Sequence, residues 1–257
     1  MNKHLSELVN KSIFIIRETN IQFKNPCVLW STGKDSTAML SLIKESFFGE
    51  VPWDVVHIDT GWKFPEMYEF RDKIFKEWKL PLVIAKSPLA GKLNPTKGTE
   101  HKDCCQKLKT DALRNIIEEK EYDVAVVSIR RDEHYIRNLE RVSSPRDKKF
   151  RWRFLRKKMR GEGGDAPFES LQDVELWDIY QSDFGDIHHV RRHPILHWTE
   201  LDVWEYVKEK RLPVNPLYFS RNGYRYRSLG CQTCTNPMKS DASTIDEIVE
   251  ELKTTKI

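Results

Sequence analysis

The sequence contains no long hydrophobic run, and no segment approaches the about 18 consecutive apolar residues of a membrane-spanning helix. The N-terminus continues as a mixed amphipathic segment, without the charged and apolar regions of a secretion signal. Internal repeats and low-complexity tracts are absent as well. We therefore expect no membrane insertion and no export, and a cytoplasmic location.

Cysteine is scarce, with five in 257 residues. An odd number in a chain without an export signal argues against a disulfide framework, so metal or redox use becomes the better question. Four of the cysteines form two close pairs, Cys104 with Cys105 and Cys231 with Cys234. The fifth, Cys27, lies in a short apolar run and is expected in the core.

The composition is that of a globular protein, with 39% hydrophobic, 32% charged and 11% aromatic residues. The length corresponds to one large or two small domains. The net charge of +4 is unevenly distributed, because residues 146–160 hold nine basic residues and one acidic residue. Such a segment suits a polyanion, an anionic substrate or an acidic partner protein, and an ordinary solvated loop has the same composition.

The spacing of apolar residues predicts alternating helices and strands through the first half of the chain. Strands that alternate with helices of ten or more residues form a parallel sheet covered on both faces, an open α/β fold that binds ligands beyond the carboxyl ends of its strands. The expected strands are 27–30, 55–58, 82–85 and 124–129, and the expected helices are 5–16, 37–47, 65–78 and 109–119.

The pattern breaks after Arg130. Residues 143–187 are polar, basic and glycine-containing without a sustained period, which predicts a long functional insertion. A strand-like segment at 189–196, a helix at 200–210 capped by Thr199 and a final helix at 244–254 follow. We divide the chain into a nucleotide-binding core at 1–135 and a substrate- or partner-binding C-terminal region at 136–257, packed on the core and partly irregular.

The segment 30–36, Trp-Ser-Thr-Gly-Lys-Asp-Ser, lies between an expected strand and an expected helix. Backbone N–H groups at a helix N-terminus, a glycine and a lysine together make a natural phosphate-binding site. It is not a Walker A loop, because the position five residues before Gly33 is Val28. The segment instead resembles the PP-loop of ATP pyrophosphatases, which cleave ATP between its α and β phosphates.

Two further segments follow expected strands and should face the same crevice. Asp59, Thr60 and Gly61 are suited to contact a nucleotide or magnesium, although a capping aspartate and a turn glycine would look the same. Arg130 and Arg131 are a candidate clamp for sulfate or phosphate, because guanidinium groups bind tetrahedral oxyanions with two hydrogen bonds. Surface pairing with nearby acidic residues is the alternative.

With these segments in place, the chain resembles the small, catalytic subunits of bacterial two-subunit sulfate adenylyltransferases, in the superfamily of PP-loop ATP pyrophosphatases and PAPS reductases. The resemblance spans roughly residues 20–257. The segments that carry it are 59–64, 66–72, 130–133, 144–147, 197–204 and 226–231.

This resemblance implies a five-stranded, mainly parallel sheet of the adenine nucleotide alpha hydrolase type. It implies ATP, Mg²⁺ and sulfate as ligands, adenylyl sulfate and pyrophosphate as products, and a GTP-hydrolysing large subunit as partner. The nucleotide-binding residues would be Ser31, Thr32, Gly33, Lys34, Asp35, Ser36, Asp59, Thr60 and Gly61. The catalytic residues would be Lys34, Asp35, Arg130 and Arg131.

The two cysteine pairs, Cys104-Cys105 and Cys231-x-x-Cys234, are similar to the four ligands of the [4Fe-4S] cluster in adenylyl-sulfate reductases. Four thiolates can hold such a cluster or a tetrahedral zinc ion, and reduced cysteines without a metal are the alternative. No cysteine follows Cys234, so the nucleophile of a reductase is missing. Sulfur insertion into nucleic acid, with the basic segment on the phosphate backbone, and a non-enzymatic nucleotide-binding subunit stay open as other functions.

Overall fold

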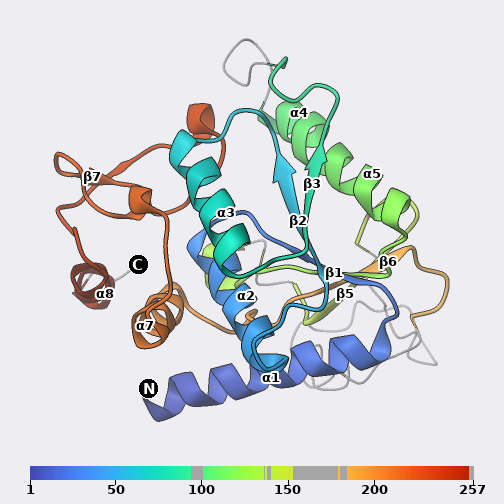
Figure 1. Ribbon diagram of the computed structural model, residues 1–257, viewed down its shortest axis with the longest axis horizontal. Helices are drawn as coiled ribbons and strands as arrows, with labels where there is room; N and C mark the ends of the chain where they lie inside the picture. The colour runs from blue at the N-terminus through green and yellow to red at the C-terminus, as the bar shows by residue number, and fades with distance from the viewer. Residues whose placement is uncertain (94–100, 136, 138–139, 153–178, 180–183, 255–257) are drawn as a thin grey trace, which may run out of the picture.

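A six-stranded sheet in the order β3-β2-β1-β4-β6-β5 forms the centre of the protein. The computed structural model in Figure 1 describes residues 1–93, 101–135, 137, 140–152, 179 and 184–254. Neighbouring strands from β3 to β6 are parallel, and only β5 runs antiparallel, against β6. The strands are β1 (Pro26–Leu29), β2 (Asp54–Asp59), β3 (Leu82–Lys86), β4 (Val124–Val126), β5 (Ser143–Arg146) and β6 (His189–Arg192).

Alternating side chains of the central strands enter two separate cores. Val28, Val55 and Val126, which are neighbours in the strand register, all point to the first core. Cys27, Val56 and Ala125 point to the second. Both faces of the sheet are therefore buried, as a parallel sheet requires.

Helices cover the two faces unequally (Figure 1). The first core contains side chains of α1, α2, α3, α7 and α8, whereas α5 packs on the second. The predicted open α/β fold with helices on both faces is confirmed. The helix bounds are α1 (Lys3–Gln22), α2 (Lys34–Ser46), α3 (Pro65–Glu77), α4 (His101–Cys105), α5 (Asp111–Lys120), α7 (Glu200–Lys210) and α8 (Ile245–Thr254), with a π-helical turn at Gln106–Thr110 between α4 and α5.

The sheet has one strand more than predicted, because the beginning of the segment 143–187 is not irregular. Ser143–Arg146 forms β5 at the edge of the sheet and is buried along its whole length. Pro145 is compatible with this place, since an edge strand need not use every N–H group. Residues 153–178 of the same segment, and with them most of the basic stretch 146–160, lie outside the described residues.

The C-terminal region contributes directly to the sheet and to its larger core. Strand β6 pairs with β4, and side chains of α7 and α8 share the first core with α1 and α2. Thr199 caps α7 as predicted, and its side chain and that of Asp202 accept hydrogen bonds from each other's backbone N–H groups. Residues 1–135 and 136–257 therefore share the central sheet and the first core.

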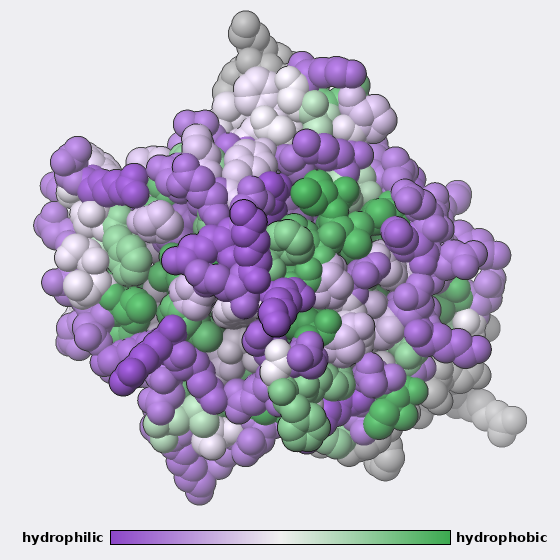
Figure 2. Space-filling view, viewed as in Figure 1, coloured by the Kyte–Doolittle hydropathy of each residue, from purple (hydrophilic) through white to green (hydrophobic). Residues whose placement is uncertain are grey.

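The surface in Figure 2 is mainly hydrophilic, with hydrophobic side chains in several separate patches. None of the helices in the described part of the chain is long and apolar enough to span a membrane.

Candidate functional site

The loop between β1 and α2 turns sharply at Thr32, which has a left-handed backbone with φ of +67°. Such a conformation is strained for a residue with a side chain and is common in functional loops. Gly33 follows as the N-cap of α2 and supplies no side-chain cap. The side chains of Ser31 and Ser36 lie 3.1 Å apart and close the turn. The N-terminus of α2, with its partial positive charge, is thereby presented at the carboxyl end of β1.

Lys34 is the first residue of α2, and only 4% of it is exposed. Three acceptors surround its ammonium group, the Arg227 carbonyl oxygen at 3.1 Å, Asp35 Oδ2 at 3.2 Å and Glu200 Oε1 at 3.4 Å. Its backbone N–H donates to the Tyr218 hydroxyl at 2.9 Å. The lysine predicted to bind phosphate is therefore held at the loop by residues of the C-terminal region.

Arg130 lies beside this lysine, whereas Arg131 turns elsewhere. The Arg130 side chain is buried and pairs with both Asp35 and Asp132. Arg131 Nη2 donates to the Glu140 carbonyl oxygen at 3.1 Å, and Nη1 lies 3.4 Å from His197 Nδ1. The described structure brings Arg130 to the β1–α2 loop and holds the Arg131 guanidinium against other partners.

Two residues at the loop were not predicted as site residues. The Glu200 carboxylate is buried between Lys34 and Arg227, and its Oε2 accepts from Arg227 Nε and NH2, both at 2.6 Å. Burial favours a higher pKa for Glu200, but Lys34, Arg227 and Arg130 outweigh it and lower the pKa below its ordinary value. The segments 197–204 and 226–231 carried the family resemblance and were the available signal.

The Asp59–Gly61 turn lies at the end of β2, next to β1. Asp59 Oδ1 accepts from the Gly61 N–H at 2.8 Å and the Tyr68 hydroxyl at 2.7 Å, and Oδ2 pairs with Lys86. Burial favours a higher pKa for Asp59, but these donors lower it to about 2. The carboxylate is therefore ionised and already committed to neighbours within the turn.

His57 links this strand to the phosphate loop. Its Nδ1 lies 2.9 Å from the Trp30 carbonyl oxygen, which can only accept, so Nδ1 carries the proton. Nε2 then accepts from the Lys63 ammonium at 3.1 Å. Burial, with the charge of Lys63, lowers the pKa of His57 to about 3, and burial lowers the pKa of Lys63 to about 8. His57 is therefore neutral, and its hydrogen bond holds Trp30, the residue before the loop.

The two cysteine pairs each combine a buried and a more accessible thiol. Cys104 and Cys231 are buried, and the Thr60 hydroxyl lies 3.2 Å from Cys231 Sγ. Burial raises the pKa of the Cys104 thiol, and the charges of Cys105, Cys231 and Cys234 raise it further. No group of three or more His, Cys, Asp or Glu side chains in the described residues is arranged to hold a metal ion. The described residues therefore form no closed ligand set, and the convergence of the four thiols stays a prediction.

Cys27 is separate from both pairs. It is fully buried in β1, and burial raises the pKa of its thiol far above the ordinary value, with further contributions from Asp54 and Asp123. Its place in the second core is the one predicted from the sequence.

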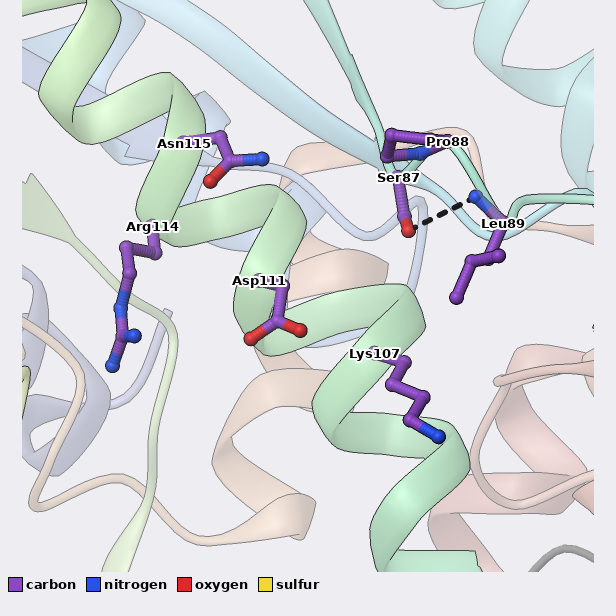
Figure 3. A pocket seen from close by; sticks show the side chains of 7 residues that line it. All are labelled: Ser87, Pro88, Leu89, Lys107, Asp111, Arg114 and Asn115. Carbon is purple, nitrogen blue, oxygen red and sulfur yellow. Dashed lines mark hydrogen bonds between the residues drawn. The ribbon is translucent and has the colours of Figure 1, made fainter.

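A cavity of about 420 Å³ lies between the end of β3 and α5 (Figure 3). Three of its polar side chains have partners elsewhere: Asp111 accepts from Gln106, Ser87 accepts from the Leu89 N–H, and Arg114 donates to the Lys149 carbonyl oxygen. In Figure 3 the Arg114 side chain points away from the turn formed by residues 87–89. The groups do not converge on a common ligand, so we assign none to this cavity.

A parallel α/β sheet with a lysine-bearing loop at a helix N-terminus defines a nucleotide-binding protein of the PP-loop class. The family model described as phosphoadenosine phosphosulfate reductase domain matches residues 25–237. A solved phosphoadenylyl-sulfate reductase from Candida auris has a TM-score of 0.59 at 15% identity, covering 92% of this chain and 98% of that chain. FMN adenylyltransferase from Candida glabrata with ATP has a TM-score of 0.58 at 16% identity, covering 89% and 61%. At these identities the likeness concerns the fold.

Curated relatives are more similar in sequence. Sulfate adenylyltransferase subunit 2 of Aeromonas salmonicida (strain A449) is 36% identical, covering 97% of this chain and 86% of the relative. The protein of the same name from Pseudomonas fluorescens (strain SBW25) is 35% identical, covering 98% and 90%. The chain belongs to the phosphoadenosine phosphosulfate reductase domain family and, within it, to the sulfate adenylyltransferase subunit 2 proteins.

Gly61 provides a test of the site's backbone packing. Its φ is +74°, and an added Cβ would lie 2.7 Å from Gly91 Cα, so Gly61→Ala must displace backbone. We expect a loss of about 1–3 kcal/mol in the free energy of unfolding, measured by urea denaturation. Gly49→Ala is the matched control, since Gly49 also has positive φ but no atom within 4 Å of the added Cβ. Equal losses in the two variants would show that the contact with Gly91 is unimportant.

Proposed function

We propose that this enzyme activates sulfate by transferring the AMP group of ATP to it, giving adenylyl sulfate and pyrophosphate in the cytoplasm. The observation that carries the proposal is the position of Lys34, buried at the N-terminus of α2 in a chain 36% identical to a sulfate adenylyltransferase subunit 2. A cation and a helix N-terminus at one point suit the β and γ phosphates, which leave as pyrophosphate.

The reaction needs no covalent enzyme intermediate. A sulfate oxygen attacks the α-phosphorus in line, the new S–O–P bond forms, and the bond to the pyrophosphate oxygen breaks. The residues 31–36 would hold the leaving group through backbone N–H groups and Lys34, with Asp35 fixing Lys34 and Arg130. The backbone of Thr60 and Gly61, at the end of the adjacent strand, would contact the nucleotide, while Asp59 shapes their turn.

We expect the phosphates of bound ATP, rather than protein side chains, to supply most of the ligands of Mg²⁺ at this site. The carboxylate of Asp59 is occupied by Gly61, Tyr68 and Lys86, and the described residues form no cluster of three ligands. Magnesium is commonly held by substrate phosphates and only one or two carboxylates. Bound to ATP, it would neutralise charge on the leaving pyrophosphate.

Sulfate requires a cation because it must approach another anion. Arg130 is buried next to Lys34 and is the arginine we propose to face sulfate. Arg131 would join it only by giving up its contacts with His197 and the Glu140 carbonyl oxygen. Of the two arginines of the predicted clamp, Arg130 would bind sulfate directly, and Arg131 would contribute only after its side chain rearranges.

The name subunit 2 of the relatives implies a partner large subunit. We propose that this partner hydrolyses GTP, because a sulfate–phosphate anhydride is strongly uphill to form and coupling to a second hydrolysis would drive it.

We also propose that Cys104, Cys105, Cys231 and Cys234 bind a [4Fe-4S] cluster or zinc. In favour, burial raises the pKa of the Cys104 thiol, and the other three cysteines contribute to the same shift. Thiolates are the ligands that both groups prefer. The described arrangement holds no ready ligand set, so binding would require the two pairs to close. No step of sulfate activation depends on this group.

Lys34→Ala should lower sulfate-dependent pyrophosphate release by about 10² to 10³, since one preorganised cationic contact to the leaving group is lost. Release is measured with ATP, with and without sulfate. Lys73→Ala, on the exposed surface of α3, serves as the control and should keep the wild-type rate. Undiminished turnover in Lys34→Ala would contradict the assignment of the loop.

Arg130→Ala should raise the KM for sulfate by at least about tenfold and change the KM for ATP less, because a charged hydrogen bond to sulfate is lost. Arg131→Ala should have the smaller effect on sulfate. Arg130→Lys, which keeps the charge beside Asp35, distinguishes loss of sulfate binding from a folding defect. If Arg130→Lys loses affinity for ATP but keeps the wild-type dependence on sulfate, Arg130 belongs to the nucleotide site and does not bind sulfate.

Protein purified without oxygen should contain iron with sulfide, or zinc, and Cys105→Ser with Cys234→Ser should remove it. Metal and sulfide analysis gives the result directly, and Cys27→Ala should leave the content unchanged. Iron with sulfide would favour the cluster-dependent function, sulfur insertion into nucleic acid, as the next activity to assay. Metal-free wild-type protein from an anaerobic preparation would argue against the site.

A further inference from the structure

Glu200 joins two cations that come from distant parts of the chain. Its Oε1 lies 3.4 Å from Lys34 Nζ, and its Oε2 accepts two hydrogen bonds of 2.6 Å from the Arg227 guanidinium. The Lys34 ammonium also donates to the Arg227 carbonyl oxygen at 3.1 Å. Arg227 is therefore attached to the phosphate loop through both its side chain and its backbone.

The position of Glu200 is fixed independently of these cations. It is the first residue of α7, directly after the Thr199 cap. Its backbone N–H donates to Asp132 Oδ2 at 2.7 Å, while Asp132 Oδ1 accepts from Arg130. The backbone of Glu200 is thus held by the start of α7 and by Asp132, in the segment that follows β4.

Arg227 has binding capacity left. Its side chain is 42% exposed, in contrast to the 4% of Lys34. Its Nε and one NH2 donor bind Glu200, and the described residues offer no hydrogen-bond partner to its remaining donors. A guanidinium has five N–H donors, so one edge is free for an anion.

The charges explain why a carboxylate is buried here. Lys34 and Arg227 carry like charges and would repel each other, and Glu200 forms an attractive ion pair with each of them. The remaining donors of Arg227 can then bind an anion while its ion pair with Glu200 stays intact.

We propose that Arg227 is a second cation for the β and γ phosphates of ATP and that Glu200 is the positioning residue that holds Arg227 beside Lys34. The inference rests on the proposed function, since it requires ATP at this loop. It adds a substrate contact from the segment 226–231, to which no role had been given.

Binding of ATP and of AMP to the full chain, measured by calorimetry, separates this role from a structural one. Arg227→Ala should weaken ATP binding by about tenfold, equivalent to about 1.4 kcal/mol, and leave AMP binding unchanged, because AMP lacks the β and γ phosphates. Arg227→Lys should recover part of the loss. Arg221→Ala, nearby in the chain and with a side chain 58% exposed, is the matched control and should bind ATP like the wild type.

Glu200→Gln should show the same selectivity for ATP over AMP. The double variant Glu200→Gln/Arg227→Ala should lose less affinity than the product of the two single losses, because Glu200 acts partly through Arg227. Equal weakening of ATP and AMP in these variants would mean a structural role and would overturn the inference.

The two proposals fail in different ways. If the wild type binds ATP, Lys34→Ala abolishes binding and Arg227→Ala has no effect, the inference on Arg227 is wrong and the proposed function stands. If the wild type does not bind ATP, the proposed function fails and this inference fails with it.

Discussion

Burial of the Lys34 ammonium is the constraint on which the rest of the site depends. An almost fully buried cation is tolerated only when acceptors replace its water, and α2 itself supplies only Asp35. The remaining acceptors, Glu200 and the Arg227 carbonyl, come from α7 and the C-terminal segment. The loop is thereby complete only when the second half of the chain packs against the first. The shared core of α2 and α7 and the pairing of β6 with β4 hold the two halves in this arrangement.

The sequence was informative wherever a local pattern determined structure. The alternating apolar spacing, the strand-loop-helix setting of Gly33 and the Thr199 cap each depend on residues only a few positions apart, and each was found in the structure. Strand β5 was missed because Ser143–Arg146 has no apolar alternation. It is buried through its pairing with β6, which no local pattern reports.

The site itself was predictable only in part. The contact between Lys34 and Arg227 spans 193 positions, so a single sequence contains no spacing that could reveal it. The adjacent arginines are a different case. Arg130 has an extended backbone, whereas Arg131 begins the 3₁₀ turn Arg131–Glu133. The sequence pattern did not predict this turn, so chemistry alone suggested a shared ligand for the two side chains.

Cys27 has a practical consequence for chemical labelling. A thiol reacts as its thiolate, and the buried thiol of β1 has a pKa raised far above its ordinary value between Asp54 and Asp123. Alkylating reagents applied to the folded protein will therefore not modify it. The modified fraction then reports mainly on Cys234, which is exposed, because Cys104 and Cys231 are buried as well. The native chain thus offers a labelling site at the second cysteine pair without background from the core.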